Sequence, residues 1–434
     1  MPKITFLGAG STVFAKNVLG DALLTPALSD AELALFDIDL VRLGESEQML
    51  KNLQHNMTQS DARIVAYTDR KEALRGADYV INAIQVGGYD PCTITDFEIP
   101  KKYGLRQTIG DTIGIGGIFR NLRTIPVMLD FARDMQEVCP DAWFLNYTNP
   151  MAALTNVMIR YGGIKTVGLC HSVQVAIPDL FKHLEMDPTG VQSRIAGINH
   201  QAWVLEITRD GEDLYPEVKR RAREKQEGQH NDMVRFEIMF RFGYYVTESS
   251  EHSAEYMPYF IKSAYPDLID RYNIPLDEYP RRCVAQIKGW QRMRDEVINN
   301  ASLSHKRSNE YASYIMEAME TDKPFKIGGN VMNTGLITNL PSEACVEVPC
   351  LVDASGVTPT FVGNLPPQCA ALNRTNTNTQ LLTIEAAITR KKDHIYHAAL
   401  LDPHTAAELS IDDIVAMCDD MIAAHGNWLP NYID

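Results

Sequence analysis

The stretch KITFLGAGS, residues 3–11, decides how the first half of this chain is interpreted. Its apolar run predicts a buried strand, and the run ends in two glycines one residue apart, Gly8 and Gly10. A helical pattern follows over Phe14–Leu23. A strand, a Gly-x-Gly turn and a helix in this order are typical of a dinucleotide-binding unit, because the backbone can approach the pyrophosphate at the glycines while the helix N-terminus supplies N–H donors. We therefore expect Gly8, Gly10 and Ser11 to contact such a cofactor.

Short apolar runs alternate with helical patterns over the first 170 residues, which predicts an α/β fold with a doubly wound parallel sheet. The predicted strands are Lys3–Leu7, Glu32–Phe36, Arg63–Tyr67, Tyr79–Ile84, Trp143–Asn146 and Thr166–Leu169. The predicted helices between them are Phe14–Leu23, Val41–Gln54, Phe119–Val138 and Pro150–Tyr161. Six strands match a complete Rossmann-type unit, so we assign residues 1–170 to an NAD-binding domain.

The pattern is less regular after residue 170, and we expect an intertwined α+β domain over 171–434 that carries the substrate site, the metal site and the contacts for oligomerisation, as in lactate/malate dehydrogenase-like folds. The predicted strands here are Ala202–Thr208, Lys326–Gly328, Cys345–Leu351 and Thr360–Val362. Helices are predicted over Ser304–Met319, Gln380–Leu400 and Ile411–Ala424, and a solvated helix or mobile loop over Lys219–Gln229.

Composition excludes several classes of protein. The 434 residues carry a formal net charge of −15, which repels nucleic acid and anionic membranes. No apolar run approaches the roughly 20 residues of a membrane-spanning helix. The chain starts directly in a strand without a signal-peptide pattern, so we expect a cytoplasmic protein whose 8 scattered cysteines are thiols. Small uncharged or metal-chelated ligands fit this charge better than polyanions.

The second predicted strand ends in LFDID, which places an acid where the ribose of a dinucleotide binds. Asp37 is the candidate to accept from the ribose hydroxyls, and Asp39 competes for that role. An acid at this place favours NAD over NADP, whose 2′-phosphate it would repel. Alternatively, either aspartate only caps the helix that follows.

Two residues later in the chain suggest a metal. Cys170 comes just after a predicted parallel strand, where ligands bind in open α/β sheets, and His200 comes just before another strand. A thiolate and an imidazole suit a transition metal, and an incomplete protein shell leaves positions for substrate oxygens. The alternative is a buried thiol and a core histidine whose hydrogen bonds are satisfied.

Long segments of the chain resemble the family 4 glycoside hydrolases, which are NAD- and metal-dependent glycosidases, and within that family the α-galactosidases that act on melibiose. The segments are ITFLGAGST, LFDID, IQVGGYDPCTITDFEIPKKYGLRQTIGDTIGIGGIFRNLRTIPV, LNYTNPMA, VGLCHSVQ, AGINH, YYVTESSEHSAEYMPYFIK, PLDEYPRRCV and LLDPHTAAELSIDDI. They extend from Ile4 nearly to the last predicted helix, so the resemblance covers essentially the whole chain.

The resemblance implies an unusual glycosidase reaction that needs NAD and a divalent cation. In this family the sugar is oxidised at C3, a base removes the C2 proton, the glycosidic oxygen leaves, water adds at C1, and the hydride returns. Cys170 and His200 would hold the cation, usually Mn²⁺. A divalent cation acts here as a Lewis acid on the sugar oxygens.

The resemblance also implies a base near the sugar C2. Tyr256 in EYMPYF matches the tyrosine that several family members use, and Asp111 in the GDT turn matches the acid that assists it. Glu251 and His252 are nearby alternatives. Tyr256 would otherwise be an ordinary core aromatic.

The leaving oxygen needs a proton. His171 follows the metal-binding cysteine, as in the galactosidase branch, and a histidine donates well near neutral pH. Alternatively, it orients the metal ligands. Asn149 in NYTNP resembles the asparagine of the family that binds sugar hydroxyls, and Tyr89 and Asp90 are candidates to line the same pocket.

We expect the substrate to be a small α-galactoside. We expect the protein itself to form a homo-oligomer, either a dimer or a tetramer. The alternatives are an α-galacturonidase or α-glucosidase of the same family, or a net NAD-dependent dehydrogenase of a sugar or hydroxy acid. A charged sugar would require a cationic side chain, for which Arg281 and Arg282 are candidates.

Overall fold

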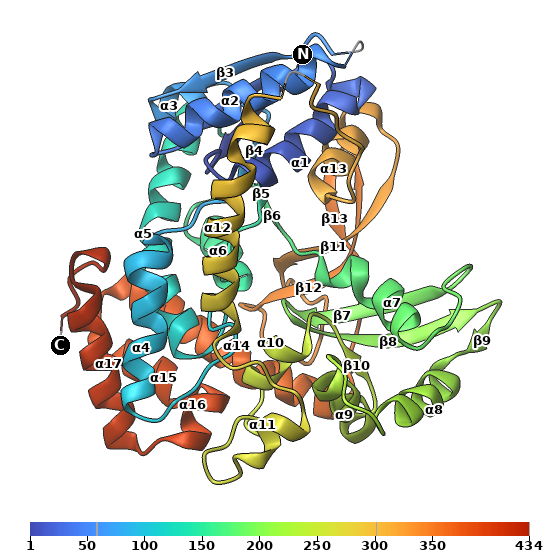
Figure 1. Cartoon of the computed structure of the whole chain (residues 1–434), viewed down its shortest axis with the longest axis vertical. Helices are drawn as coiled ribbons and strands as arrows, with labels where there is room; N and C mark the ends of the chain where they lie inside the picture. Colours follow the sequence, from blue (N-terminus) through green and yellow to red (C-terminus); the bar gives the residue numbers. More distant parts are fainter. Residues whose placement is uncertain (58–59, 301, 434) are drawn as a thin grey trace.

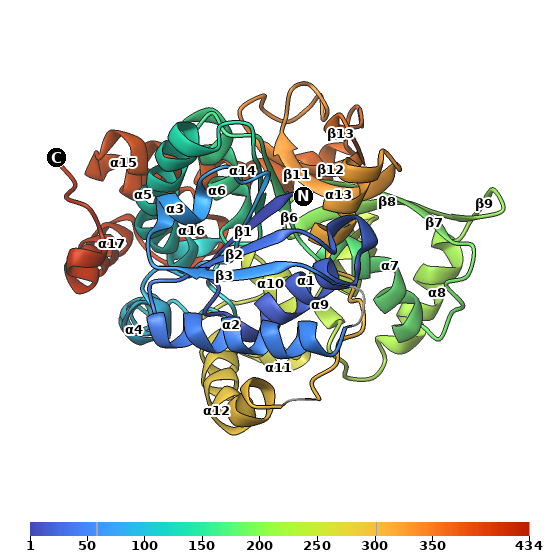
Figure 2. The same ribbon diagram turned by 90° about the horizontal axis from the view of Figure 1, so that it is seen from above.

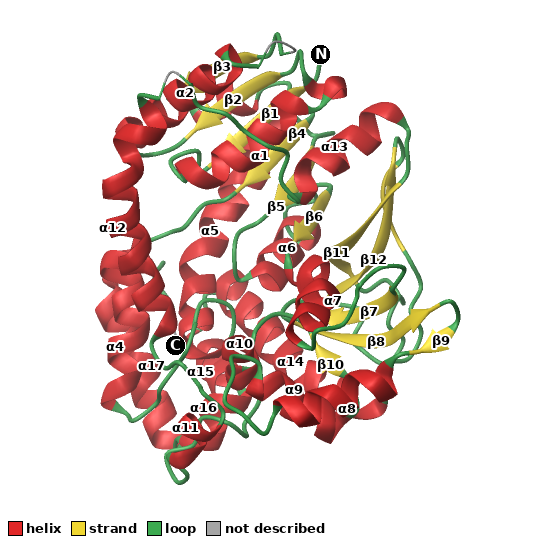
Figure 3. Ribbon diagram, turned by 45° about the vertical axis from the view of Figure 1, so that its right-hand side comes forward, coloured by secondary structure: helices red, strands yellow, loops and turns green. Residues whose placement is uncertain are grey.

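One continuous β-sheet organises the molecule. The computed structural model describes residues 1–57, 60–300 and 302–433, and within them the strands form a 13-stranded sheet in the order β10-β8-β7-β12-β11-β6-β5-β4-β1-β2-β3, with β13 paired to β12 and β9 paired to β8 (Figure 3). The half from β3 to β6 is parallel and the half from β11 to β10 is antiparallel. The two halves join where β11 pairs with β6.

The parallel half confirms the Rossmann-type arrangement predicted from the sequence. Its strands are β1 (Lys3–Leu7), β2 (Glu32–Phe36), β3 (Arg63–Tyr67), β4 (Tyr79–Asn82), β5 (Trp143–Asn146) and β6 (Thr166–Leu169). The order β3-β2-β1-β4-β5-β6 is the doubly wound order of dinucleotide-binding units. The carboxyl ends of all six parallel strands therefore lie at one edge of the sheet.

Helices cover both faces of this half (Figures 1 and 2). The helices of residues 1–183 are α1 (Thr12–Leu24), η1 (Pro26–Leu28), α2 (Leu40–His55), α3 (Arg70–Leu74), η2 (Gly88–Thr93), α4 (Ile94–Lys102), α5 (Gly114–Val138), α6 (Met151–Arg160) and α7 (Ser172–His183). Of these, α7 packs on the antiparallel half instead. One apolar core lies under α1 and α2, and a second lies under α5 and α6. Burial of the sheet on both faces explains the apolar runs by which its strands were predicted.

The remaining chain builds the antiparallel half and the helices around it. The strands are β7 (Gln192–Ile198), β8 (Gln201–Arg209), β9 (Glu212–Asp213), β10 (Tyr245–Val246), β11 (Phe325–Met332), β12 (Cys345–Asp353) and β13 (Gly356–Pro359). The helices are α8 (Tyr215–Lys225), α9 (Met233–Phe242), α10 (Ser250–Glu255), α11 (Asp267–Arg271), α12 (Glu278–Ile298), α13 (Tyr311–Thr321), α14 (Pro367–Thr389), α15 (Lys392–Leu400), α16 (Pro403–Glu408), α17 (Ile411–His425) and η3 (Gly426–Trp428).

The later segments return to the first half, as the expected intertwining requires. Helix α12 crosses to α2, where Arg294 pairs with Glu45, and α13 packs beside α1 (Figure 1). Helices α14, α15 and α17 complete the core under α5. The division of the chain into two domains at residue 170 stays a prediction.

Three elements differ from their sequence-based prediction. The helix predicted over Ser304–Met319 begins only at Tyr311, because His305 and Ser308 in the preceding segment bind the side chain of Asp21 on α1. The helix predicted over Gln380–Leu400 is two helices, since Arg390 has a left-handed φ of 61° that ends α14. Thr360–Val362 is not a strand; the chain pairs with β12 just before it, in β13.

Two expectations from composition can be compared with the fold. No helix in the described part of the chain is long and apolar enough to cross a membrane. All 8 cysteines are free and buried, as expected for thiols. The ambiguous segment Lys219–Gln229 is helical up to Lys225, as part of α8.

Candidate active site

The candidate residues meet at the edge where the parallel strands end. The glycine turn follows β1, Asn149 lies three residues after β5, and Cys170 and His171 follow β6 directly. Ligands bind at this edge in doubly wound sheets. The order of the strands therefore brings the predicted dinucleotide and metal residues to the same side of the molecule.

The glycine turn is fixed by its backbone conformation and by two hydrogen bonds. Gly8 has a φ of +90°, and a Cβ at this position would lie 2.6 Å from the carbonyl oxygen of Ala83, so only glycine fits. The hydroxyl of Ser11 donates to the Gly8 carbonyl at 2.8 Å. The N–H of Gly10 donates to Oδ2 of Asp37 at 2.6 Å. The turn and the end of β2 are thus held together in one unit.

The two aspartates after β2 have different roles in the structure. Asp39 is the N-cap of α2, and its Oδ1 accepts from the N–H groups of Val41 at 3.0 Å and Arg42 at 3.1 Å. Asp37 instead faces the glycine turn. The capping alternative therefore holds for Asp39, and Asp37 as the ribose-binding acid stays a prediction.

Cys170, His200 and Glu248 form a set of potential metal ligands. Their ligand atoms all lie within 4.8 Å of one another, and His200 Nε2 is 3.8 Å from Glu248 Oε2. Both His200, between β7 and β8, and Glu248, between β10 and α10, have a positive φ, of 62° and 67°. Such strained backbone at non-glycine residues is common at functional sites. The set brings together the two ligands predicted from the sequence and adds a carboxylate.

The charges around this set favour a bound cation. Burial raises the pKa of the Cys170 thiol well above its usual range, and the nearby carboxylates of Glu347 and Glu248 raise it further. Burial also opposes the negative charge of Glu248, but His200 and neighbouring cationic groups hold its pKa below the usual value. A divalent ion would compensate a thiolate and a carboxylate buried together.

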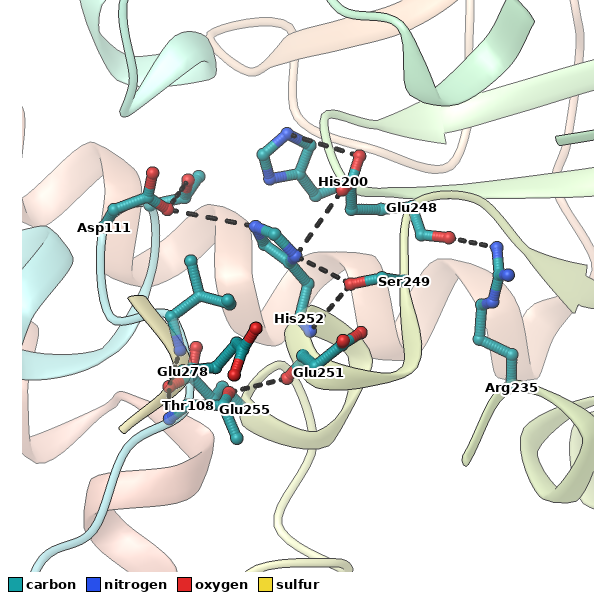
Figure 4. A network of polar contacts seen from close by, with 12 residues as sticks. Thr108, Asp111, His200, Arg235, Glu248, Ser249, Glu251, His252, Glu255 and Glu278 are labelled. Atoms are coloured by element: carbon teal, nitrogen blue, oxygen red, sulfur yellow. Dashed lines mark hydrogen bonds and ion pairs between the residues drawn. The ribbon is translucent and has the colours of Figure 1, made fainter. Parts of the chain in front are cut away.

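His252 lies between Glu248 and Asp111, as Figure 4 shows. Its Nδ1 is 3.5 Å from Glu248 Oε1 and shares a hydrogen bond of 3.0 Å with the Ser249 hydroxyl. Its Nε2 is 3.9 Å from Asp111 Oδ1. The ring meets that of His200 edge to face at 4.6 Å. Burial lowers the pKa of His252. The imidazole thus connects the ligand set to the GDT turn.

The GDT turn is fixed by a buried carboxylate that the sequence analysis did not single out. Glu255 accepts hydrogen bonds from the backbone N–H groups of Thr108 at 2.5 Å, Ile109 at 3.1 Å and Gly110 at 3.1 Å. Burial raises the pKa of Glu255 to about 7, against the effect of these donors. The turn that carries Asp111 is therefore attached to α10 (Figure 4).

Tyr256 lies beside the same cluster. The residue is 1% exposed, and its ring centroid is 6.5 Å from that of His200. Among the described residues its hydroxyl has no hydrogen-bond partner. Burial raises its pKa well above 10, and Asp111 raises it further. An unpartnered buried hydroxyl at this place is poorly explained by a core role, because such groups are normally hydrogen-bonded. Glu251, the alternative base, pairs with Arg282 at 3.2 Å.

His171 and Asn149 complete the predicted residues. The side chain of His171 is 47% exposed, and its Nε2 lies 2.7 Å from Oε2 of Glu310. That hydrogen bond raises the pKa of His171. The side-chain oxygen of Asn149 is buried and has no hydrogen-bond partner in the part of the chain that the structure describes, which leaves it available for a ligand.

The candidates for a charged substrate have partners of their own. Arg281 and Arg282 both pair with Glu278 on their own helix, at 2.7 Å and 2.9 Å. Glu248, Glu255 and Glu310 are the site residues that the sequence analysis missed. The acidic segment TESSEHSAEY could have indicated Glu248 and Glu255. Glu310 is 139 positions from His171, so no local pattern links the two residues.

Comparison with known proteins gives one consistent result. The model of the family described as family 4 glycosyl hydrolase matches residues 3–186, and its C-terminal domain matches residues 195–405. An α-galactosidase of Bacillus subtilis (strain 168) is 68% identical over 432 residues, which is 100% of both chains. An α-galactosidase of Rhizobium meliloti (strain 1021) is 36% identical and covers 99% of this chain and 89% of its own.

Solved structures agree in fold. A 6-phospho-α-glucosidase from gut microorganisms, in complex with NAD and Mn²⁺, superposes with a TM-score of 0.82 at 21% identity and covers 100% of both chains. A malate dehydrogenase of Plasmodium falciparum has a TM-score of 0.55 at 14% identity, covering 91% of this chain and 100% of its own. The dehydrogenase-like fold expected from the sequence is thereby confirmed.

Proposed function

Because the chain belongs to the family 4 glycosyl hydrolases, we propose that it hydrolyses terminal α-D-galactosides of the melibiose type with NAD and Mn²⁺, or another divalent cation, as cofactors. The 68% identity to an α-galactosidase over the full chain supports galactose as the sugar. The observation that carries the proposal is the juxtaposition of the glycine turn and the Cys170–His200–Glu248 set at one edge of the sheet. A glycosidase that relies on two carboxylates needs neither feature.

The residues present fit both cofactors. A thiol, an imidazole and a carboxylate whose ligand atoms lie within 4.8 Å form a suitable donor set for a transition metal. The turn over Gly8–Ser11 with Asp37 beside it fits a dinucleotide. When bound, NAD would accept and return a hydride at the sugar C3, and the cation would polarise the C2 and C3 oxygens.

The chain itself supplies the proton transfers. Tyr256 takes the proton from C2, for which it must first lose its own proton. Burial and Asp111 both raise the pKa of Tyr256, and a neighbouring cation would counteract both effects. His171 donates a proton to the glycosidic oxygen as the C1–O bond breaks, and later accepts one from the water that adds to C1. Asn149 binds the sugar through its unpartnered oxygen.

An assay of the purified protein tests the proposal. Hydrolysis of p-nitrophenyl α-galactoside, α-glucoside and α-galacturonide is measured with and without NAD⁺, Mn²⁺ and a reductant. We expect cleavage of the galactoside that requires both cofactors and many turnovers for each NAD. NADH that accumulates in step with product would instead indicate a net dehydrogenase. Preference for the galacturonide would reassign the sugar. The dimeric or tetrameric state and the cytoplasmic location stay predictions.

A further inference from the structure

Glu310 contacts His171 although it belongs to a distant part of the chain. It is the residue before α13, and its carboxylate oxygen Oε2 lies 2.7 Å from His171 Nε2. The side chain of Glu310 is 11% exposed, whereas that of His171 is 47% exposed. The contact therefore holds the more exposed ring from the buried side and uses one of its two nitrogens.

Glu310 is held in turn by helix α1. Its N–H donates to the hydroxyl of Ser308 at 3.1 Å, and that hydroxyl donates to Asp21 Oδ2 at 2.5 Å. The other oxygen of Asp21, Oδ1, accepts from Ser308 N–H at 2.7 Å and lies 2.6 Å from His305 Nε2. Asp21 is fully buried on α1, the helix that starts at the glycine turn.

The segment from His305 to Glu310 is packed closely against helix α1. A Cβ on Gly20 would lie 2.8 Å from the His305 ring, so helix and segment touch without space between them. The carboxylate of Glu310 therefore stands at a fixed place relative to the glycine turn.

We infer that Glu310 is a positioning residue for the proton-donating histidine: it binds Nε2 of His171 and so leaves Nδ1 to exchange a proton with the glycosidic oxygen. The inference rests on the proposed function. In the elimination step the C1–O bond breaks, its electron pair leaves with the oxygen, and the Nδ1 proton joins that oxygen. In the addition step a water oxygen bonds to C1, and the water proton returns to Nδ1.

The test compares leaving groups, because a good leaving group needs no proton. The full chain, loaded with NAD⁺ and Mn²⁺, is assayed as wild type and as Glu310→Gln on melibiose and on α-galactosyl fluoride. We expect kcat/KM on melibiose, which reports the steps up to loss of the leaving group, to fall about 10- to 100-fold, as for other residues that orient a catalytic group. On the fluoride kcat/KM should fall less than about threefold. Equal losses on both substrates would overturn the inference, as would no loss on either.

A second readout separates this inference from the proposed function. Removal of the C2 proton precedes loss of the leaving group, so melibiose recovered from D2O should still exchange its C2 hydrogen with Glu310→Gln while its cleavage is slow. Wild type that shows neither exchange nor cleavage would contradict the proposed function itself. Exchange lost in the variant together with cleavage would contradict only the positioning role.

Two further variants control for folding. Glu317→Gln removes the partner of Arg307, at 2.7 Å, without touching His171. The ratio of kcat/KM on melibiose to kcat/KM on the fluoride should therefore stay at the wild-type value. Ser308→Ala releases the N–H of Glu310 but keeps its carboxylate. Ser308→Ala should lower this ratio, as Glu310→Gln does. If Glu310→Gln does not fold, Ser308→Ala serves as the test in its place. An unchanged ratio in Ser308→Ala would then overturn the inference.

Discussion

Replacing Glu248 by glutamine removes one negative charge from the Cys170–His200–Glu248 set while keeping an oxygen donor of the same length. In the structure Glu248 Oε2 is 3.8 Å from His200 Nε2, and all ligand atoms of the set lie within 4.8 Å of one another. An ion bound by Cys170 and His200 would therefore be close to this carboxylate. Glutamine keeps the shape of the side chain but offers only a carbonyl dipole.

The size of the effect follows from the charge that is lost. Two unit charges 4 Å apart interact by about 4 kcal/mol at an effective dielectric constant near 20, and a dication doubles this to about 8 kcal/mol. The amide oxygen and solvent recover part of that energy. We expect a net loss of about 3 kcal/mol, which corresponds to a dissociation constant for Mn²⁺ about 100-fold higher.

The assay is titration of the metal-free protein with Mn²⁺, followed by the EPR signal of free Mn²⁺ at neutral pH. Glu237→Gln is the matched control, because Glu237 pairs with Arg241 on α9 and is not part of the ligand set. A dissociation constant for Glu248→Gln within about threefold of wild type would refute the assignment of Glu248 as a metal ligand.

Two further predictions concern the metal and the dinucleotide. Burial raises the pKa of the Cys170 thiol, so metal binding must displace a proton. The affinity for Mn²⁺ should therefore rise about tenfold per pH unit between pH 6 and 8. An isothermal titration that shows no proton release on metal binding would contradict this. Asp37→Ala should weaken NAD⁺ binding in a fluorescence titration, whereas Asp39→Ala should leave it unchanged and lower the free energy of unfolding by about 1 kcal/mol, since only Asp39 caps α2. Equal effects of the two substitutions on NAD⁺ binding would count against Asp37.

The parallel half could be predicted because its strands are buried on both faces and its turns carry their own signals. The strand Lys3–Leu7 and the turn at Gly8 both depend on local sequence. The later errors have long-range causes. The helix expected from Ser304 is shortened because Asp21 binds the segment before Tyr311, and no pattern near Ser304 encodes that contact.

The site residues also fall into two groups: those whose place follows from local sequence and those placed by long-range contacts. Cys170 could be placed because it directly follows a strand whose position in the sheet follows from the fold. Glu248 depends on a positive φ that its own sequence does not predict, and Glu310 depends on a segment folded back onto α1. Cys170 was thus predictable from its place after a strand, whereas Glu248 and Glu310 depend on contacts with distant parts of the chain.

Hydrolysis of an α-galactoside in D2O tests the central claim most directly, since that claim is that the C2–H bond of the sugar breaks during cleavage. The released galactose is analysed by NMR for deuterium at C2, and the absorbance of NADH is followed in the same reaction. We predict deuterium at C2 of the product and no net NADH. Galactose that keeps its original hydrogen at C2 would contradict the mechanism.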